Sequence, residues 1–279
     1  MLHIGKQQRL KIMREKPQGY YLSDGEDEVL MPRKYITPEM DEGDEVEVLV
    51  YCDSEGREIA TTETPALLVG EYAYLRVTDV KDVGAFCDWG VTKELFIPFS
   101  NQLKKMEKGQ SYVVHMYLDD VSERLVGSTK LRNHLLKSDE DIHMGQKVKC
   151  LPYAMTPIGI KVVLDQKYDG MIYSSELQGR KVNLGEPILG YVRPLRPDGK
   201  IDVSLDPVGR AHVDEHSEVV IQKLTAAGGK LPYSDKSSPE DIRKVFGMSK
   251  KLFKKTIGGL YKQKTILIKE GGIELTPPS

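Results

Sequence analysis

The feature that most constrains the fold of this 279-residue chain is a pattern that occurs three times before residue 205. In each copy a strand-like segment leads into a glycine, and a second apolar segment ends 13 or 14 residues after that glycine. Another glycine follows 24 to 26 residues after the first and opens a further apolar segment. The leading glycines are Gly19, Gly84 and Gly159, and the later ones are Gly43, Gly109 and Gly185. Such a period is typical of tandem structural units.

Each copy spans about 65 residues and holds five short apolar segments separated by turns that contain Gly, Asp and Pro. Short strands at this regular spacing predict small barrels or sandwiches. Five strands with a longer connection between the third and the fourth fit the five-stranded OB barrel. The sequence therefore predicts a multidomain, mainly β chain with OB-fold barrels at residues 1–63, 64–138 and 139–209.

Residues 210–279 break this pattern and predict an α+β winged helix-turn-helix. A first helix ends at Gly228-Gly229, a second begins after Ser238 with Pro239 in its first turn, and a third begins after Ser249. A strand, a Gly271-Gly272 turn and a last strand complete the order of a winged helix, with the hairpin as its wing. The residues that we expect to face inward are Val220, Leu224 and Ala227 in the first helix, and Leu252, Phe253, Ile257, Leu260 and Tyr261 in the third.

Charge is divided unevenly along the chain, although the net charge is only −2. Residues 1–63 carry 8 Lys and Arg against 15 Asp and Glu, a net charge of −7. Residues 210–279 carry 13 against 8, a net charge of +5, whereas residues 64–139 and 140–209 are balanced. An acidic head and a basic tail indicate that only part of the chain faces a polyanion.

The second copy contains the stretch VKDVGAFCDWG at residues 80–90, followed by an apolar strand and a serine. Over residues 70–130 it resembles the S1-type RNA-binding domain, the OB-fold module of ribosomal protein S1 and of many RNA-processing proteins. The other two copies match this module more weakly. Three such modules followed by a winged helix resemble the layout of the conserved virulence factor B (YitL-like) family of bacterial RNA-binding proteins. That resemblance covers nearly the whole chain and implies a cytoplasmic, non-enzymatic protein that binds RNA and influences gene expression after transcription.

The resemblance also implies where each module contacts RNA. In S1-type domains an aromatic residue two positions after the leading glycine stacks on a base, and the matching residues are Phe86, Tyr21 and Lys161. A second position on the next strand corresponds to Pro32, Pro98 and Tyr173. A basic position after the fourth-strand turn corresponds to Arg57, Arg124 and Lys200. The aromatic residue that commonly precedes the glycine is absent, because Gln18, Val83 and Ile158 occupy that position.

Strand periodicity distinguishes two interpretations of Phe86. An aromatic residue in an apolar strand is often part of the core, but the small residues Ala85 and Cys87 flank Phe86 and point to the opposite face. An aromatic ring on the solvated face of a barrel can stack on a base, which contributes about 1–3 kcal/mol per base. Trp89 fits either a cover over the end of the barrel or a binding residue.

Two groups of basic residues are further candidate RNA contacts, with a merely solvated face as the alternative for each. The third copy gathers Lys161, Tyr173, Arg193, Arg196 and Lys200 around its equivalent face. The third helix of the C-terminal domain carries like charges four residues apart, which slightly destabilise an isolated helix. Contact with phosphate explains such clustering. These residues are Lys250, Lys251, Lys254, Lys255 and Lys262, and Arg243 and Lys244 on the preceding helix extend them.

No pattern in the sequence predicts catalysis, a metal site or a cofactor. The six histidines form no HxH or HExxH pattern, and His212 and His216 lack a third ligand. There is no GxxxxGK[ST] motif and no dinucleotide-binding motif. The cysteines at positions 52, 87 and 150 form no CxxC pair, which indicates reduced cysteines in the cytoplasm. No apolar run approaches the ~18 residues of a membrane span, and the N-terminus has no signal-peptide apolar region.

We therefore predict a cytoplasmic, non-catalytic protein that binds single-stranded RNA through cations on phosphates and aromatic rings on bases. We expect a monomer that does not bind membranes, with the ribosome or the RNA-processing machinery as further candidate partners. One alternative is a transcription factor that recognises duplex DNA through residues 249–262, although lysine suits phosphates better than base edges. Another alternative is an adaptor whose barrels dock on a ribosome or a nuclease.

Overall fold

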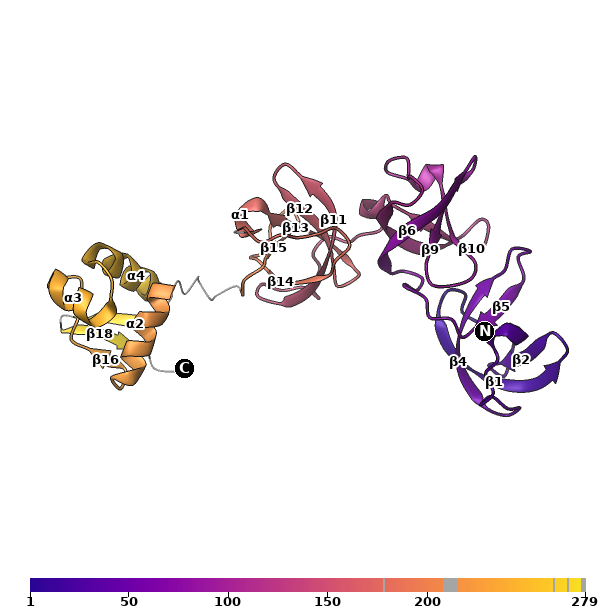
Figure 1. Ribbon diagram of the computed structural model, residues 1–279, viewed down its shortest axis with the longest axis horizontal. Helices are drawn as coiled ribbons and strands as arrows, with labels where there is room; N and C mark the ends of the chain where they lie inside the picture. Colours follow the sequence, from indigo (N-terminus) through magenta and orange to yellow (C-terminus); the bar gives the residue numbers. More distant parts are fainter. Residues whose placement is uncertain (178, 208–214, 263, 270, 277–279) are drawn as a thin grey trace. The chain divides into compact units, whose positions relative to one another are not determined.

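The computed structural model describes residues 1–177, 179–207, 215–262, 264–269 and 271–276 (Figure 1). The chain divides into two compact units, Met1–Leu205 and Asp206–Ser279. The first unit contains three closed five-stranded barrels, and the second contains helices and a three-stranded sheet. The predicted fold class, three OB-like barrels followed by a winged helix, is confirmed. The predicted boundaries at residues 63, 138 and 209 stay predictions.

The three barrels have the same topology. In each barrel the third strand pairs in parallel with the fifth, and the fourth strand closes the barrel against the first. The first barrel consists of β1 (Gln7–Lys16), β2 (Gly19–Ser23), β3 (Glu28–Pro32), β4 (Glu45–Cys52) and β5 (Glu58–Thr61). The second consists of β6 (Tyr72–Lys81), β7 (Gly84–Asp88), β8 (Leu95–Pro98), β9 (Ser111–Asp119) and β10 (Arg124–Ser128). The third consists of β11 (Lys147–Thr156), β12 (Gly159–Leu164), β13 (Tyr168–Tyr173), β14 (Ile188–Val192) and β15 (Ile201–Ser204), with the short helix α1 (Ser174–Leu177) after β13.

A close approach between two backbones requires the leading glycine of each copy. Gly84 has a φ of +155°, and a Cβ atom there would lie 2.4 Å from the carbonyl oxygen of Ile97 on β8. At Gly19 and Gly159 the φ angles are +149° and +155°. A Cβ atom at these positions would lie 2.0 and 2.2 Å from a carbonyl oxygen of the next strand. Only glycine leaves room for this contact, which explains why the three copies share the residue.

Hydrophobic contacts join the barrels within the first unit. Trp89 is 2% exposed and belongs to a core that extends from the second barrel to Tyr51 of the first. The rings of Trp89 and Tyr51 meet edge to face, with centroids 6.3 Å apart. A smaller cluster joins Tyr72 of the second barrel to Leu151 and Val163 of the third. Of the two interpretations of Trp89, the structure therefore supports packing.

The second unit has the element order that the sequence predicts. Its elements are α2 (Glu215–Ala226), β16 (Lys230–Leu231), α3 (Pro239–Phe246), α4 (Lys250–Lys262), β17 (Ile266–Lys269) and β18 (Gly272–Leu275). The side chain of Ser238 accepts a hydrogen bond from the Asp241 amide at the start of α3, and the hydroxyl of Ser249 accepts one from the Leu252 amide at the start of α4. Both predicted caps are therefore confirmed.

Two residues that we expected in the core of this unit are exposed. Ala227 is exposed because α2 ends at Ala226, so the chain no longer follows the stripe of Val220 and Leu224. Tyr261 is 52% exposed, because it lies one residue beyond the buried Leu260 and one residue turns a helix by about 100°. Both predictions were wrong, because Ala227 lies beyond the end of its helix and Tyr261 lies beside the buried stripe of its helix.

Some sequence predictions fall outside the described residues. The predicted domain boundary at residue 209 lies within residues 208–214, and so does His212. Along the described stretches of chain, no helix is long and apolar enough to cross a membrane.

We expect Gly84→Ala to destabilise the second barrel, because the added Cβ atom would collide with the Ile97 carbonyl oxygen. The free energy of unfolding should fall by at least about 1–3 kcal/mol, the usual cost of a strained backbone. Urea unfolding followed by Trp89 fluorescence measures this loss, because Trp89 is the only tryptophan and lies in this core. Gly258→Ala on α4 is the control, since a Cβ atom there meets open space. An unchanged unfolding midpoint for Gly84→Ala would contradict the packing argument.

Candidate nucleic-acid interface

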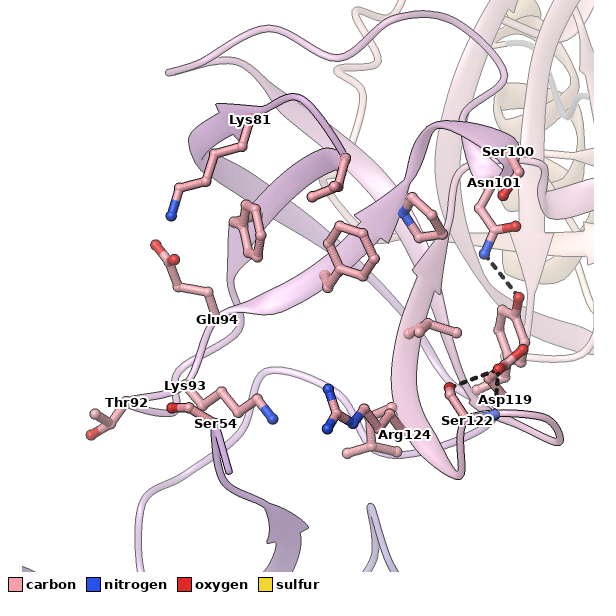
Figure 2. Close-up of a pocket in the computed structure, with 17 residues that line it drawn as sticks. Ser54, Lys81, Thr92, Lys93, Glu94, Ser100, Asn101, Asp119, Ser122 and Arg124 are labelled. Carbon is pink, nitrogen blue, oxygen red and sulfur yellow. Dashed lines mark hydrogen bonds between the residues drawn. The ribbon is translucent and has the colours of Figure 1, made fainter. Parts of the chain in front are cut away.

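A cavity of about 890 Å³ opens on the outer face of the second barrel (Figure 2). All five strands of this barrel contribute side chains to it, and so do the connections between them. One residue of the first barrel, Ser54 in the β4–β5 turn, also lines this cavity.

Strand alternation directs two aromatic rings out of the barrel and into the cavity. On β7, Ala85 and Cys87 are fully buried, whereas Phe86 between them is half-buried. On β8, Phe96 is likewise half-buried between two buried neighbours. Antiparallel pairing places Phe86 directly opposite Phe96, and their ring centroids lie 5.2 Å apart. The outward orientation expected of Phe86 is therefore observed, and Phe96 adds a second aromatic ring to the same face.

Three cations line the same cavity as this aromatic pair. The ammonium nitrogen of Lys81 lies 5.0 Å from the centroid of the Phe86 ring. Lys93 and Arg124 line another part of the cavity and extend toward one another (Figure 2). An aromatic platform flanked by cations is the combination that binds single-stranded nucleic acids, because bases stack on rings and phosphates pair with cations.

Polar groups on the far side of the cavity are held by hydrogen bonds. The Asn101 amide donates to the Tyr117 hydroxyl oxygen at 2.8 Å and to the Gly127 carbonyl at 3.2 Å. The Tyr117 hydroxyl keeps its own hydrogen, which can be donated to a ligand. Asp119 accepts hydrogen bonds from the hydroxyl and the amide of Ser122, and these bonds lower the pKa of its carboxyl. This side of the cavity therefore offers fixed polar groups beside the rings.

Sequence reasoning missed Phe96, Lys81 and Lys93. For Phe96 a signal was present, because the strand LFIP alternates in the same way as the strand that holds Phe86. The S1-type resemblance points instead to Pro98, which lines the cavity but pairs with Gly84. Nothing near Lys93 in the sequence predicts its place, since its partners lie about 40 residues earlier, at positions 52 and 53.

On the equivalent face of the first barrel, an arginine side chain lies over the aromatic ring. The guanidinium of Arg14 lies 4.7 Å from the centroid of the Tyr21 ring. Two hydrogen bonds, 2.5 and 2.7 Å long, join that guanidinium to Glu28, and this pairing lowers the pKa of the Glu28 carboxyl. A base could stack on this side of Tyr21 only after displacing Arg14. The structure therefore places Tyr21 on the predicted face but occupies one side of its ring.

The third barrel brings its predicted cations together and pairs them with carboxylates. Arg196 donates to both carboxylate oxygens of Asp198, at 3.1 and 3.0 Å, and Lys200 lies 3.2 Å from the same carboxylate. Arg193 forms a salt bridge with Glu176. A phosphate at this face would have to compete with these carboxylates.

The third barrel also lacks an aromatic pair at the position of Phe86 and Phe96. Lys161 on β12 lies opposite Met171 on β13. Tyr173 lies at the end of β13, where its hydroxyl accepts a hydrogen bond from Arg196 at 3.2 Å, and it lines a cavity of about 300 Å³ with Arg193. The predicted residues therefore surround a smaller site, in which a single ring is bound to a guanidinium.

The predicted cations of the winged helix lie on its surface. Lys251, Lys255 and Lys262 are exposed on one side of α4, as their spacing of four and seven residues requires. Lys254 is exposed and lies 3.4 Å from the carboxylate of Asp235. Lys250 is half-buried, and Arg243 and Lys244 are exposed on α3. The predicted role of these residues in RNA binding stays a prediction.

Buried histidine and cysteine side chains of the first unit have shifted pKa values. The rings of His115 and His134 are tilted by 38° with centroids 4.4 Å apart, and burial lowers the pKa of His115 to about 4. Cys87 and Cys150 are buried in strands, which raises the pKa of each thiol to about 12. Within the described residues, no group of three or more His, Cys, Asp or Glu side chains is placed to hold a metal ion.

Comparison with known proteins finds two matching domain families. Residues 4–63 match the S1 domain family, and residues 218–275 match the CvfB-like winged helix domain family. Both matches support nucleic-acid binding by this chain.

Sequence similarity to known proteins covers most of the chain. The uncharacterized protein YitL of Bacillus subtilis is 29% identical over 96% of this chain and 92% of its own length. Conserved virulence factor B of Staphylococcus aureus is 29% identical over 85% of this chain and 81% of its own length. The crystal structure of a multidomain protein with nucleic acid binding domains from Streptococcus pneumoniae aligns over 98% of both chains, with 24% identity and a TM-score of 0.44.

We expect Phe86→Ala and Phe96→Ala each to weaken binding of a single-stranded RNA oligonucleotide by about 1–3 kcal/mol, the usual value of one stacked base. Unfolding followed by Trp89 fluorescence should change little, because both rings are only half-buried. Phe99→Ala is the matched control, since Phe99 belongs to the same barrel, is 43% exposed and does not line the cavity. If the first two variants bind as tightly as Phe99→Ala, the rings are not the platform.

Proposed function

We propose that this chain, which is similar to conserved virulence factor B and YitL, binds single-stranded RNA. The observation that carries the proposal is the pair Phe86 and Phe96, which faces an open cavity among three cations. An unpaired strand exposes the faces of its bases to such rings, whereas a duplex hides them within its stack. The resemblance to S1-type RNA-binding domains supports RNA over single-stranded DNA.

The second barrel is the main binding module in this proposal. The ammonium of Lys81 lies near Phe86, but its nearest carboxylate, that of Asp79, is 4.0 Å away, so it is held only weakly. In the first barrel, two short hydrogen bonds to Glu28 hold Arg14 against Tyr21, and in the third barrel carboxylates neutralise the cations. The first barrel also carries the net charge of −7, which repels a phosphate backbone at distances up to about the Debye length of 8 Å.

The winged helix contributes phosphate contacts in this proposal. The residues of α4 include five lysines and no Arg, Asn or Gln, the side chains that most often read base edges in duplex DNA. Lysine is a point charge that suits phosphates of any nucleic acid. This composition favours RNA backbone binding over the alternative of a sequence-reading transcription factor.

We extend the proposal to the setting in which the chain acts. It is a non-catalytic, cytoplasmic protein that regulates gene expression after transcription, and it works as a monomer on RNA. The support is the family resemblance together with the absence of a predicted catalytic motif. The ribosome and the RNA-processing machinery are the partners that such a role would bring into contact with it.

A titration of the full chain with single-stranded RNA, single-stranded DNA and duplex DNA tests the proposed function. Measured by fluorescence anisotropy at two salt concentrations, single-stranded RNA should bind most tightly at both. Duplex DNA should bind most weakly, because its bases are unavailable for stacking. Tighter binding of duplex DNA at both salt concentrations would favour the transcription-factor alternative and overturn the proposal.

Replacing Lys250, Lys251, Lys254 and Lys255 with Gln should weaken RNA binding and flatten its salt dependence. The slope of log affinity against log salt should fall by about 0.7 for each phosphate contact that is lost. The control replaces Lys223 and Lys236 with Gln, which are exposed cations of the same unit outside α4. If the slope of log affinity against log salt equals that of the control, α4 does not belong to the binding surface.

A further inference from the structure

The first barrel closes one side of the cavity of the second. Ser54 in the β4–β5 turn lines this cavity. The ammonium group of Lys93 donates to the carbonyl oxygens of Cys52 and Asp53 in the same region, at 2.6 and 2.8 Å. Together with the buried contact of Trp89 and Tyr51 within the shared core, these bonds fix the turn against the second barrel.

Lys93 therefore brings a cation to the junction of two barrels. An ammonium group has three hydrogen-bond donors, and the two carbonyls use two of them. Both acceptors are neutral, so the charge of Lys93 is not balanced by them. Burial lowers the pKa of Lys93, and this effect exceeds the opposing influence of Cys52 and Asp53.

Arg124 places a second cation at the same junction. Figure 2 shows its side chain and that of Lys93 extending toward one another near Ser54. The guanidinium also lies against the turn, because a Cβ atom on Gly56 would be 3.3 Å from Nη2 of Arg124. The positive charge of Arg124 repels the Lys93 ammonium and contributes to lowering its pKa, so an anion between the two groups would be stabilised.

The carboxylates near this junction do not supply that anion. Asp53 is engaged by Arg57, whose Nε and Nη2 lie 2.9 and 2.7 Å from its carboxylate. Glu94 lines the cavity, but its side chain points away from Lys93 in Figure 2. Among the salt bridges of the described residues, none involves Lys93 or Arg124.

We propose that Lys93 and Arg124, held by the β4–β5 turn of the first barrel, form a subsite for one backbone phosphate of the strand whose base stacks at Phe86 and Phe96. This inference rests on the proposed function and adds the first barrel to the site. The first barrel positions Lys93 through the backbone carbonyls of its turn and forms the wall at Ser54. It therefore contributes to RNA binding even though its own aromatic face is covered.

The test uses the full chain and a short labelled oligoribonucleotide of mixed sequence, with affinity measured across a salt series. Lys93→Gln and Arg124→Gln should each weaken binding, and Lys105→Gln, an exposed cation outside the cavity, should not. Because both cations serve one phosphate, the double variant should lower the log–log slope by about 0.7 in total. A loss near twice that value, or none, would overturn the shared subsite.

A second pair of variants tests whether the β4–β5 turn at Ser54 borders the phosphate subsite, and it leaves Lys93 unchanged. Ser54→Glu places a carboxylate at the junction and should weaken binding about tenfold or more, as expected for a like charge beside a phosphate in a partly closed site. Thr37→Glu adds the same charge to an exposed position of the same barrel outside the cavity and should leave affinity unchanged. Equal effects of the two variants would show that only net charge matters and would overturn the inference.

The outcomes separate this inference from the proposed function. If the parent chain binds RNA and Phe96→Ala weakens that binding, but the junction variants behave like their controls, only the phosphate subsite is wrong. If the parent chain does not bind single-stranded RNA, both are wrong.

Discussion

The close approach of Gly84 to β8 is the constraint on which the candidate site depends. A carbonyl oxygen occupies the space where a side chain would begin, so β7 and β8 pair with Gly84 opposite Pro98. That register sets Phe86 opposite Phe96, and strand alternation turns both rings outward. The strand neighbours of the two rings, which are Ala85, Cys87, Leu95 and Ile97, point into the core of the barrel. One face of the two strands therefore stabilises the fold while the other carries the platform.

The same register in the other two barrels gives no open platform, because different side chains occupy the equivalent positions. In the first barrel Leu30 lies opposite Tyr21, and Arg14 covers the tyrosine ring. In the third barrel the equivalent residues are Lys161 and Met171. Among the described residues of the three barrels, only the second barrel therefore has two aromatic rings facing each other at these positions. The junction with the first barrel adds Lys93 to that pair, which makes the neighbouring module part of the site.

The fold could be predicted because its signals are local. Glycine spacing and strand alternation depend on residues close in sequence, and all three copies repeat them. Helix caps of the winged helix, such as Ser238, are equally local. The site could be predicted only in part. Phe86 follows from alternation alone, but recognising Phe96 as its partner requires the pairing register of β7 and β8. The anchoring of Lys93 requires knowing that the first barrel packs against the second. No sequence pattern shows that Arg14 covers Tyr21.

The most direct test of the account is an NMR titration of the full chain with single-stranded RNA, using isotope-labelled phenylalanine rings. The chain has five phenylalanines, which makes each ring signal assignable. The account predicts large shifts for Phe86 and Phe96, because a base would stack on them, and small shifts for Phe246 and Phe253, which are buried in the winged helix. Shifts at Phe246 and Phe253 with unchanged signals from Phe86 and Phe96 would contradict it.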